Sequence, residues 1–271
     1  MTRPQILGIL NVTPDSFSDG GRWSDLDAAI EQATALHEQG ADIIDVGGES
    51  TRPGAGRVSA EEELERVLPV IRELAQRDIR VSIDTMNSVT AAAAVEAGAD
   101  IVNDVSGGLA DPEMYRVVAA TGAHYVAMHW RAHSSTMQDA AHYTDVVAEV
   151  RHELTTRLAE AIVWGIDPGK LIVDPGLGFS KTADHNWALL AALPDLVTLG
   201  FPVLIGASRK GFLAEFTTEG APPADRDRAT ATISALSAQA GAWGVRVHNV
   251  EETRRELAIW DRWSAAGGMS R

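Results

Sequence analysis

The sequence predicts an α/β protein, a single-domain (β/α)8 barrel with two mobile loops at its active site. Eight short apolar runs alternate with longer amphipathic segments along the 271 residues. No linker interrupts the alternation, so we expect one domain over residues 1–263 and a flexible tail at 264–271. The first strand-to-helix turn lacks the GxGxxG pattern usual in an open doubly wound sheet, which disfavours that alternative.

The eight runs are apolar nearly throughout, as expected for parallel strands buried on both faces. The segments between them, such as 61–76 and 143–164, place apolar residues at helical spacing. Glycine or Asp-Pro follows several of these segments, which is typical of a helix end. The predicted strands are 5–12, 42–48, 81–85, 100–105, 124–130, 171–176, 203–208 and 245–250.

Composition excludes several classes of protein and of site. The formal net charge of −15 disfavours a nucleic-acid partner, which would need a basic face. The absence of cysteine excludes disulfides, thiolate metal sites and a cysteine nucleophile. The first apolar run is too short for a signal peptide, and no stretch is long enough to span a membrane. We therefore expect a cytoplasmic protein without a membrane partner.

Polar residues stand at the carboxyl ends of most predicted strands. In a barrel these ends converge on one rim, where active sites are built. Any single Asp or Asn could instead cap the following helix, and we expect this of Asp104 and Asn249. A carboxylate inside an apolar run needs a partner, so the set implies a donor-rich ligand or an internal cation. It comprises Asn11, Asp45, Glu49, Asp84, Thr85, Asn103, Asp104, His129, Arg131, Asp174, Ser208, Arg209, Lys210, Arg246, His248 and Asn249.

Three acceptors of this set, Asp84, Asn103 and Asp174, fall on neighbouring parts of the rim. They suit a flat heterocycle that carries amino and ring N–H donors. Asn11 offers a neutral oxygen that could lie near a hard cation such as Mg²⁺, with the phosphates of a substrate supplying the other ligands.

Cationic residues form the other half of the set. Lys210, Arg246 and His248, joined by Arg52 from a loop, suit a phosphate or pyrophosphate. This is an unusual local patch in so acidic a chain. Lys210 could alternatively be a Schiff-base lysine, with its neighbour Arg209 depressing the pKa of the ammonium.

Two polar loops, at 13–24 and 49–58, carry Phe17 and Arg52. In each loop, a proline restricts the backbone and two glycines then permit the chain to reverse direction. Such loops could close over a ligand as a lid. The alternative is an ordinary surface turn, with Phe17 packed against a helix.

Seven motifs stand in order over nearly the whole chain: "NVTPDSFSDGG", "DVGGESTRPGA", "SIDT", "NDVSGG", "DPGLGF", "GASRK" and "RVH". Together they closely resemble those of dihydropteroate synthases, the folate-pathway enzymes that sulfonamides inhibit. The resemblance implies a (β/α)8 barrel that acts as a homodimer and uses Mg²⁺. It also implies condensation of 6-hydroxymethyl-7,8-dihydropterin pyrophosphate with p-aminobenzoate.

The resemblance also implies roles for individual residues, with Asp84, Asp174, Lys210 and Arg52 as the catalytic set. The pterin would be held by Asp84, Asn103, Asp174 and Lys210, in a pocket lined by Met128 and Phe179. The pyrophosphate would be held by Thr51, Arg246 and His248, with Asn11 on the Mg²⁺ side. The p-aminobenzoate site would be formed by Phe17, Arg52 and Pro53.

One position departs from the family pattern. Gly211 stands where many members have a serine that helps to bind the carboxylate of p-aminobenzoate. Backbone N–H groups would then have to bind this carboxylate. The departure puts the affinity for p-aminobenzoate and for sulfonamides in doubt, and leaves the reaction itself unaffected.

Other readings stay open at this point. A methyltransferase of the related pterin-binding barrels would share the acceptors but would have less use for two closing loops and a pyrophosphate site. An inactive or divergent paralogue would keep the barrel, since fold alone does not imply function. His129 and His133 have i, i+4 spacing, but they follow a predicted strand rather than lying on a helix, so we assign no zinc.

Overall fold

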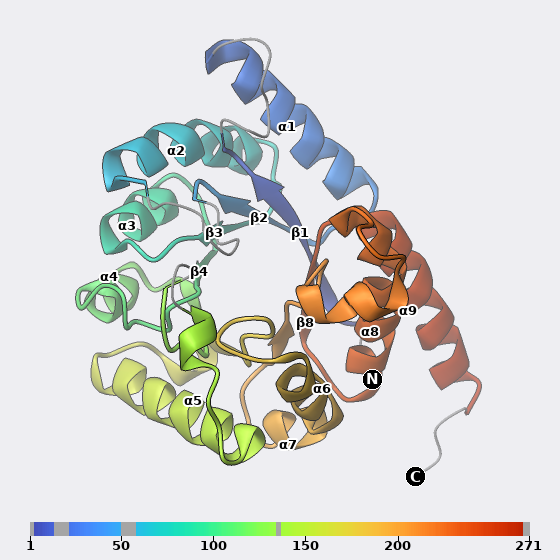
Figure 1. The fold of residues 1–271 in the computed structure, drawn as a ribbon. Coiled ribbons are helices and arrows are strands. Elements are labelled where there is room, and N and C mark those ends of the chain that lie inside the picture. The colour runs from blue at the N-terminus through green and yellow to red at the C-terminus, as the bar shows by residue number, and fades with distance from the viewer. Residues whose placement is uncertain (1–2, 14–21, 50–57, 134–136, 268–271) are drawn as a thin grey trace.

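In the computed structural model the chain forms a closed barrel of eight parallel strands surrounded by helices (Figure 1). The structure describes residues 3–13, 22–49, 58–133 and 137–267. The strands are hydrogen-bonded in the order β6-β5-β4-β3-β2-β1-β8-β7. A parallel bridge between Val173 and Val203 joins the two ends of this order and closes the barrel. The predicted fold class is therefore confirmed, and the two predicted loops lie largely outside the described residues.

Each of the eight predicted strands is present; seven are one or two residues shorter than predicted, and the seventh strand is four residues shorter. The strands are β1 (Gln5–Asn11), β2 (Ile43–Gly47), β3 (Val81–Asp84), β4 (Ile101–Asp104), β5 (His124–Met128), β6 (Leu171–Asp174), β7 (Leu204–Ile205) and β8 (Gly244–Val247).

Helices connect successive strands, and several of them begin with a side chain that caps the first backbone N–H groups. Ser59 accepts a hydrogen bond from the Glu62 amide at the start of α2, and Asn249 does the same for Glu252 at the start of α9. In the described part of the chain, no helix is both long and apolar enough to cross a membrane. The helices are α1 (Arg22–Glu38), α2 (Ala60–Gln76), α3 (Ser88–Glu96), α4 (Met114–Thr121), α5 (Val146–Val163), α6 (Ala183–Ala191), α7 (Leu193–Val197), α8 (Asp227–Gln239) and α9 (Val250–Ala265).

Helix α9 continues two residues past the predicted domain end at residue 263. Ser264 and Ala265 are helical, and the backbone N–H of Ala266 donates to the carbonyl of Arg262 at the end of the helix. Helix α9 therefore includes the first two residues of the predicted tail, and residues 268–271 lie outside the described residues.

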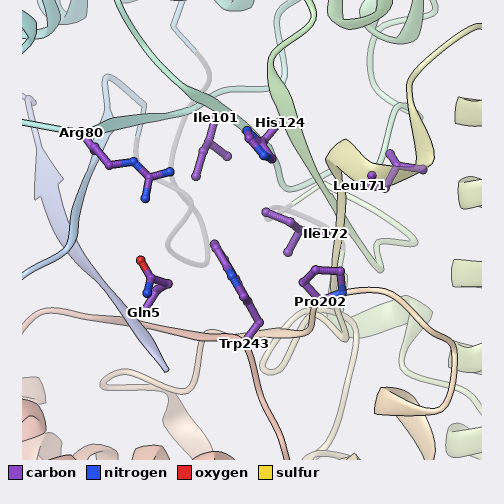
Figure 2. A pocket seen from close by; sticks show the side chains of 9 residues that line it. Gln5, Arg80, Ile101, His124, Leu171, Ile172, Pro202 and Trp243 are labelled. Atoms are coloured by element: carbon purple, nitrogen blue, oxygen red, sulfur yellow. The ribbon is translucent and has the colours of Figure 1, made fainter. Parts of the chain in front are cut away.

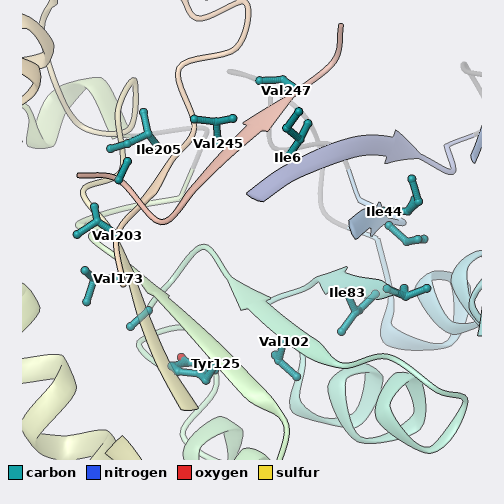
Figure 3. Packing of buried hydrophobic residues seen from close by; sticks show 14 of the residues in the cluster. Ile6, Ile44, Ile83, Val102, Tyr125, Val173, Val203, Ile205, Val245 and Val247 are labelled. Carbon is teal, nitrogen blue, oxygen red and sulfur yellow. The ribbon is translucent and has the colours of Figure 1, made fainter. Parts of the chain in front are cut away.

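Alternation along the strands sorts their side chains into two sets. Odd-numbered residues of β1 and β2 and even-numbered residues of β3, β6 and β8 face the barrel axis; the others pack under the helices (Figure 3). A layer of Leu7, Ile43, Ile101, Val126, Ile172 and Leu204 fills the barrel interior. On β4, β5 and β6, the next inward-facing residues are Asn103, Met128 and Asp174, which lie at the carboxyl-end rim.

Asp104 lies on the outer face of β4, as alternation predicts. Its carboxylate accepts from the Ser106 amide and hydroxyl, the Gly108 amide and the Tyr125 hydroxyl, all within 2.8 Å. Burial raises the pKa of Asp104, whereas these donors lower it. Asp104 therefore fixes the turn after β4 rather than capping the next helix, and it takes no part in the rim cluster.

Replacing Tyr125 with phenylalanine should weaken the fold. The Tyr125→Phe change removes one of four donors from a carboxylate that is fully buried. We expect the free energy of unfolding to fall by about 1–3 kcal/mol in urea titrations. A loss smaller than about 0.5 kcal/mol, within the range of neutral surface changes, would contradict this account of Asp104.

Candidate active site

A pocket opens at the carboxyl-end rim of the barrel and contains six of the predicted site residues. These residues come from β4, β5, β6 and β8 and from the loops after β6 and β7, so chain segments far apart in the sequence meet there. The lining comprises Asn103, Val105, Met128, Asp174, Leu177, Phe179, Gly206, Lys210 and Arg246.

Arg246 lies at the centre of the rim and bridges two carboxylates. Its Nε atom is 2.5 Å from Oδ2 of Asp45, and an Nη atom is 2.6 Å from Oδ2 of Asp84. The Asn103 amide also donates weakly to Asp45, at 3.3 Å. Sequence reasoning placed Asp45 at a strand end without giving it a role. The structure shows that Asp45 is fully buried and anchors the arginine.

Asp84 has a pKa near neutrality. Burial raises the pKa of Asp84 to about 7; Arg246 opposes this shift, and the neighbouring Asp45 adds to it. One guanidinium between two carboxylates leaves the group with a net negative charge. Asp84 can therefore gain or lose a proton near neutral pH, when an N–H donor of a ligand arrives.

Asp174 lies across the pocket from this cluster. Its Oδ1 accepts from the Gly176 amide at 2.7 Å, and burial raises its pKa. A Cβ atom on Gly206 would lie 3.5 Å from Asp174 Oδ2, so this glycine leaves the second oxygen open toward the pocket. Asp174 therefore offers an acceptor to a ligand.

Lys210 reaches into the same pocket. Its Nζ atom lies 4.0 Å from the centroid of the Phe179 ring, a cation–π contact. Burial lowers the pKa of Lys210 to about 8, and Arg246 contributes to the shift. The prediction that Arg209 depresses this pKa is wrong. Arg209 has a φ of 58°, which turns its side chain away to pair with Asp227 on α8 at 2.7 Å.

Apolar side chains form the walls between these polar groups. Val105, Met128 and Phe179 pack together with Met137, which follows β5 in a short 3-10 helix (Met137–Ala140). Leu177 completes the lining. The resulting slot has apolar walls and polar ends, which suits a flat ring with hydrogen-bonding groups on its edge. Val105, Leu177 and Met137 were missed because isolated apolar residues in loops give no signal in sequence.

Three further predicted residues lie around the rim. A Cβ atom on Gly47 would lie 3.9 Å from Asn11 Oδ1 and 3.8 Å from Asp84 Oδ2, so Asn11 faces the cluster across this glycine. His248 Nδ1 is 2.9 Å from the Ser208 hydroxyl. Gly211 begins a 3-10 helix (Gly211–Phe216) directly after Lys210. The remaining predicted residues, Phe17, Thr51, Arg52 and Pro53, lie outside the described residues.

His129 belongs to a different network. Its Nε2 is 2.9 Å from a Glu153 oxygen, and its Nδ1 is 2.9 Å from Lys181 Nζ. Among the described residues, no group of three His, Cys, Asp or Glu side chains is arranged to hold a metal ion.

A second hollow lies at the opposite, amino-terminal end of the barrel (Figure 2). Trp243, Ile172 and Ile101 form its apolar floor, and Arg80 and His124 stand at its edge. Its lining contains no carboxylate and none of the predicted site residues. In barrels of this type, chemistry is built at the carboxyl ends of the strands. We therefore place the candidate active site at the rim that carries Asp84, Asp174 and Lys210.

The geometry supports one kind of chemistry. Carboxylate and amide acceptors can bind the N–H edge of a flat ring, while cations beside them can stabilise an anion that leaves from that ring. Apolar walls reduce the access of water to the ring.

Comparison with known proteins identifies relatives over nearly the whole chain. The model of a family described as "Pterin binding enzyme" matches residues 7–248. Dihydropteroate synthase of Mycobacterium leprae is 53% identical over 268 residues, which cover 97% of this chain and 94% of the relative.

Solved structures agree with this match. Dihydropteroate synthase of Xanthomonas albilineans with 4-aminobenzoic acid superposes with a TM-score of 0.90 at 45% identity, covering 97% of this chain and 94% of the other. A structure of dihydropteroate synthase from the same organism in complex with 7,8-dihydropteroate gives a TM-score of 0.87 at 43% identity, with the same coverage.

Removing the charge of Asp45 should shift the titration of Asp84. In Asp45→Asn, the carboxylate that raises the pKa of Asp84 is gone, and Arg246 can pair with Asp84 alone. We expect the pKa of Asp84 to fall below about 7. NMR titration of ¹³C-aspartate-labelled protein measures it, with Asp84→Asn identifying the resonance. An unchanged or higher pKa would contradict the arrangement.

Proposed function

The chain belongs to the dihydropteroate synthase family of pterin-binding enzymes, and we propose that the rim pocket is its active site. The enzyme condenses 6-hydroxymethyl-7,8-dihydropterin pyrophosphate with p-aminobenzoate, giving 7,8-dihydropteroate and pyrophosphate. It is a transferase of folate biosynthesis. The observation that carries the proposal is the meeting of acceptors and cations in one apolar-walled pocket, which is lined by Asn103, Asp174, Lys210 and Arg246 and has Asp84 beside it on the neighbouring strand.

The acceptors bind the pterin ring. Asp174 and Asn103 line the pocket, and Asp84 lies beside them on the neighbouring strand. Their oxygens face the amino and ring N–H groups of the pterin, while Met128 and Phe179 cover its faces. Lys210, with its lowered pKa, donates to a ring acceptor. A buried site of this kind rejects rings that lack the matching donors, since its polar groups would then be unpaired.

The reaction is a displacement at the methylene carbon of the pterin. The C–O bond to pyrophosphate breaks first, and negative charge moves to the leaving group while positive charge develops on the pterin. Carboxylates at the ring end and cations at the other stabilise this separation. The amine nitrogen of p-aminobenzoate then forms the new C–N bond and releases a proton. We infer an SN1-like course without a covalent enzyme intermediate.

The pyrophosphate lies toward His248 and Arg246, joined by Thr51 from the loop after β2. Arg246 is already paired with Asp45 and Asp84, so its contribution to the leaving group is that of a fixed, oriented charge. His248 is oriented by the Ser208 hydroxyl. Residues Phe17, Arg52 and Pro53 complete the p-aminobenzoate side in this proposal, and sulfonamides would compete there.

Magnesium fits this site only together with the substrate. Asn11 supplies an oxygen ligand, and the missing side chain of Gly47 leaves room beside it. No cluster of three metal-binding side chains exists among the described residues. Mg²⁺ prefers oxygen ligands and commonly binds through phosphates. We therefore propose that Asn11 would hold Mg²⁺ together with the pyrophosphate of the substrate, and that the ion would supply positive charge to the leaving group.

A second copy of the chain would cover an exposed apolar face on α8 and α9. Leu236, Ile259 and Trp263 on these packed helices are 58%, 63% and 63% exposed. Large exposed apolar side chains on two packed helices are typical of protein interfaces. We propose that this face forms a homodimer.

The proposed activity is tested directly by release of pyrophosphate from the two substrates with Mg²⁺. We expect release by the wild type and a loss of about a hundred-fold or more in Lys210→Met and in Asp174→Asn, since each removes a group at the reacting pterin. Circular dichroism checks that both variants are folded. A wild type that releases no pyrophosphate would favour the inactive-paralogue alternative.

Gly211 offers a test of the p-aminobenzoate side. A Cβ atom at this position would meet nothing within 4 Å, so a serine fits. Its hydroxyl could donate to the substrate carboxylate, and such a charged hydrogen bond contributes about 1.5–3 kcal/mol. We expect Gly211→Ser to lower the KM for p-aminobenzoate about ten-fold or more, with the KM for the pterin unchanged.

Gly211→Ala is the matched control, because it adds the Cβ atom without the hydroxyl. Equal KM values for p-aminobenzoate in the serine and alanine variants would show that the carboxylate does not lie beside residue 211.

A further inference from the structure

Lys181 is a buried lysine that does not itself line the proposed substrate pocket. The chain has only three lysines, at 170, 181 and 210. Lys210 lines the pocket, and Lys170 is partly exposed in the turn before β6. Lys181 is 3% exposed, although burial of an ammonium is unfavourable without strong partners. Its position therefore calls for a specific set of partners.

The Nζ atom of Lys181 has three acceptors, one for each of its hydrogens. It lies 3.0 Å from the carbonyl oxygen of Gly176, 3.0 Å from that of Phe179 and 2.9 Å from Nδ1 of His129. Two of these acceptors belong to the loop between β6 and α6. The ammonium therefore connects two points of this loop to each other and to the end of β5.

The connected loop carries the pocket wall. It follows Asp174 directly and presents Leu177 and Phe179 to the pocket. Its backbone enters the left-handed region at Gly176 (φ 68°), Gly178 (φ 78°) and Ser180 (φ 47°). Such a path is favourable for glycine but not for serine, so external hydrogen bonds must stabilise it.

His129 completes the arrangement as a neutral base. Lys181 donates to Nδ1, so the ring proton is on Nε2 and is donated to Glu153 at 2.9 Å. Glu153 also accepts from Arg131, which fixes the carboxylate. Burial lowers the pKa of His129 to about 4, and the charge of Lys181 adds to this shift. The histidine therefore stays neutral and available as an acceptor at physiological pH.

We propose that Lys181 is a positioning residue of the pterin site: its ammonium, held by neutral His129, fixes the loop that presses Leu177 and Phe179 against the ring. This inference rests on the proposed function and assigns Lys181 no contact with the substrate. Phe179 is also the ring under Lys210 Nζ, so displacement of the loop would disturb both the wall and the cation.

The first test replaces Lys181 with methionine, which keeps the length of the side chain and removes the three donors. Calorimetry with 6-hydroxymethyl-7,8-dihydropterin measures the affinity. We expect binding about ten-fold weaker or more, since misplacement by about 1 Å can cause losses of this size. Lys170→Met is the matched control and should bind like the wild type.

The outcomes separate the two proposals. If the wild type fails to bind the pterin, the proposed function is wrong and this inference loses its premise. If the wild type binds and folded Lys181→Met binds within two-fold of it, the positioning role is wrong while the proposed function stands.

A pair of variants at His129 keeps the test valid if Lys181→Met does not fold. Asparagine can place an oxygen acceptor near the position of Nδ1, whereas leucine cannot. We expect His129→Asn to retain more pterin affinity than His129→Leu, with melting temperatures measured alongside. Equal pterin affinities in the two folded variants would overturn the proposal.

The pKa of Lys181 is a further readout, because a purely packing role of His129 would leave this pKa unchanged. Protein labelled with ¹³C-lysine has only three Cε resonances, and Lys181→Met identifies the one from Lys181. Burial lowers the pKa of Lys181 to about 7. His129→Leu removes an acceptor from the charged form, so the pKa should fall further. An unchanged titration would show that His129 does not hold the ammonium.

Discussion

The ion pairs of Arg246 are the interaction on which the rest of the site depends. One guanidinium joins Asp45 at the barrel interior to Asp84 at the rim. Without it, two carboxylates from adjacent strands would be buried side by side, which is strongly unfavourable. With it, the guanidinium balances the charge of Asp45 in the interior, and the pKa of Asp84 lies near 7. The barrel can thus maintain a reactive acceptor in a place where water is largely excluded.

The order of the strands in the barrel decides where the charged groups of the site lie. Acceptors lie on β3, β4 and β6, and cations lie on β8 and in the loop after β7. Because β6 and β7 close the barrel, Lys210 comes next to Asp174 although 36 residues separate them in sequence. The lowered pKa of Lys210 and the raised pKa of Asp174 share a cause, which is burial of both groups. A ligand that carries matching donors and an anionic leaving group offsets the unfavourable burial of both groups.

Strand alternation explains how much of this could be predicted. Period-two patterning places Asp84, Asn103 and Asp174 on the inner face, and the same rule turns Asp104 outward. It could not reveal that Asp45 binds Arg246, because this pair spans 201 residues and exists only after closure. The assignment of Arg209 failed because a single left-handed residue redirects its side chain to Asp227. The position of Lys181 was equally hidden, since two of its three partners are backbone carbonyls that carry no sequence signal.

The most direct measurement of the central claim is the proton balance of pterin binding at Asp84. With a pKa of about 7, roughly half of the Asp84 carboxyls are protonated at pH 7. A pterin N–H donor favours the ionised form, so binding should release a proton from Asp84. Calorimetry at pH 7 in buffers of different ionisation enthalpy measures this release. The account predicts release of up to about half a proton more in the wild type than in Asp84→Asn. Equal proton release in the two proteins would contradict it.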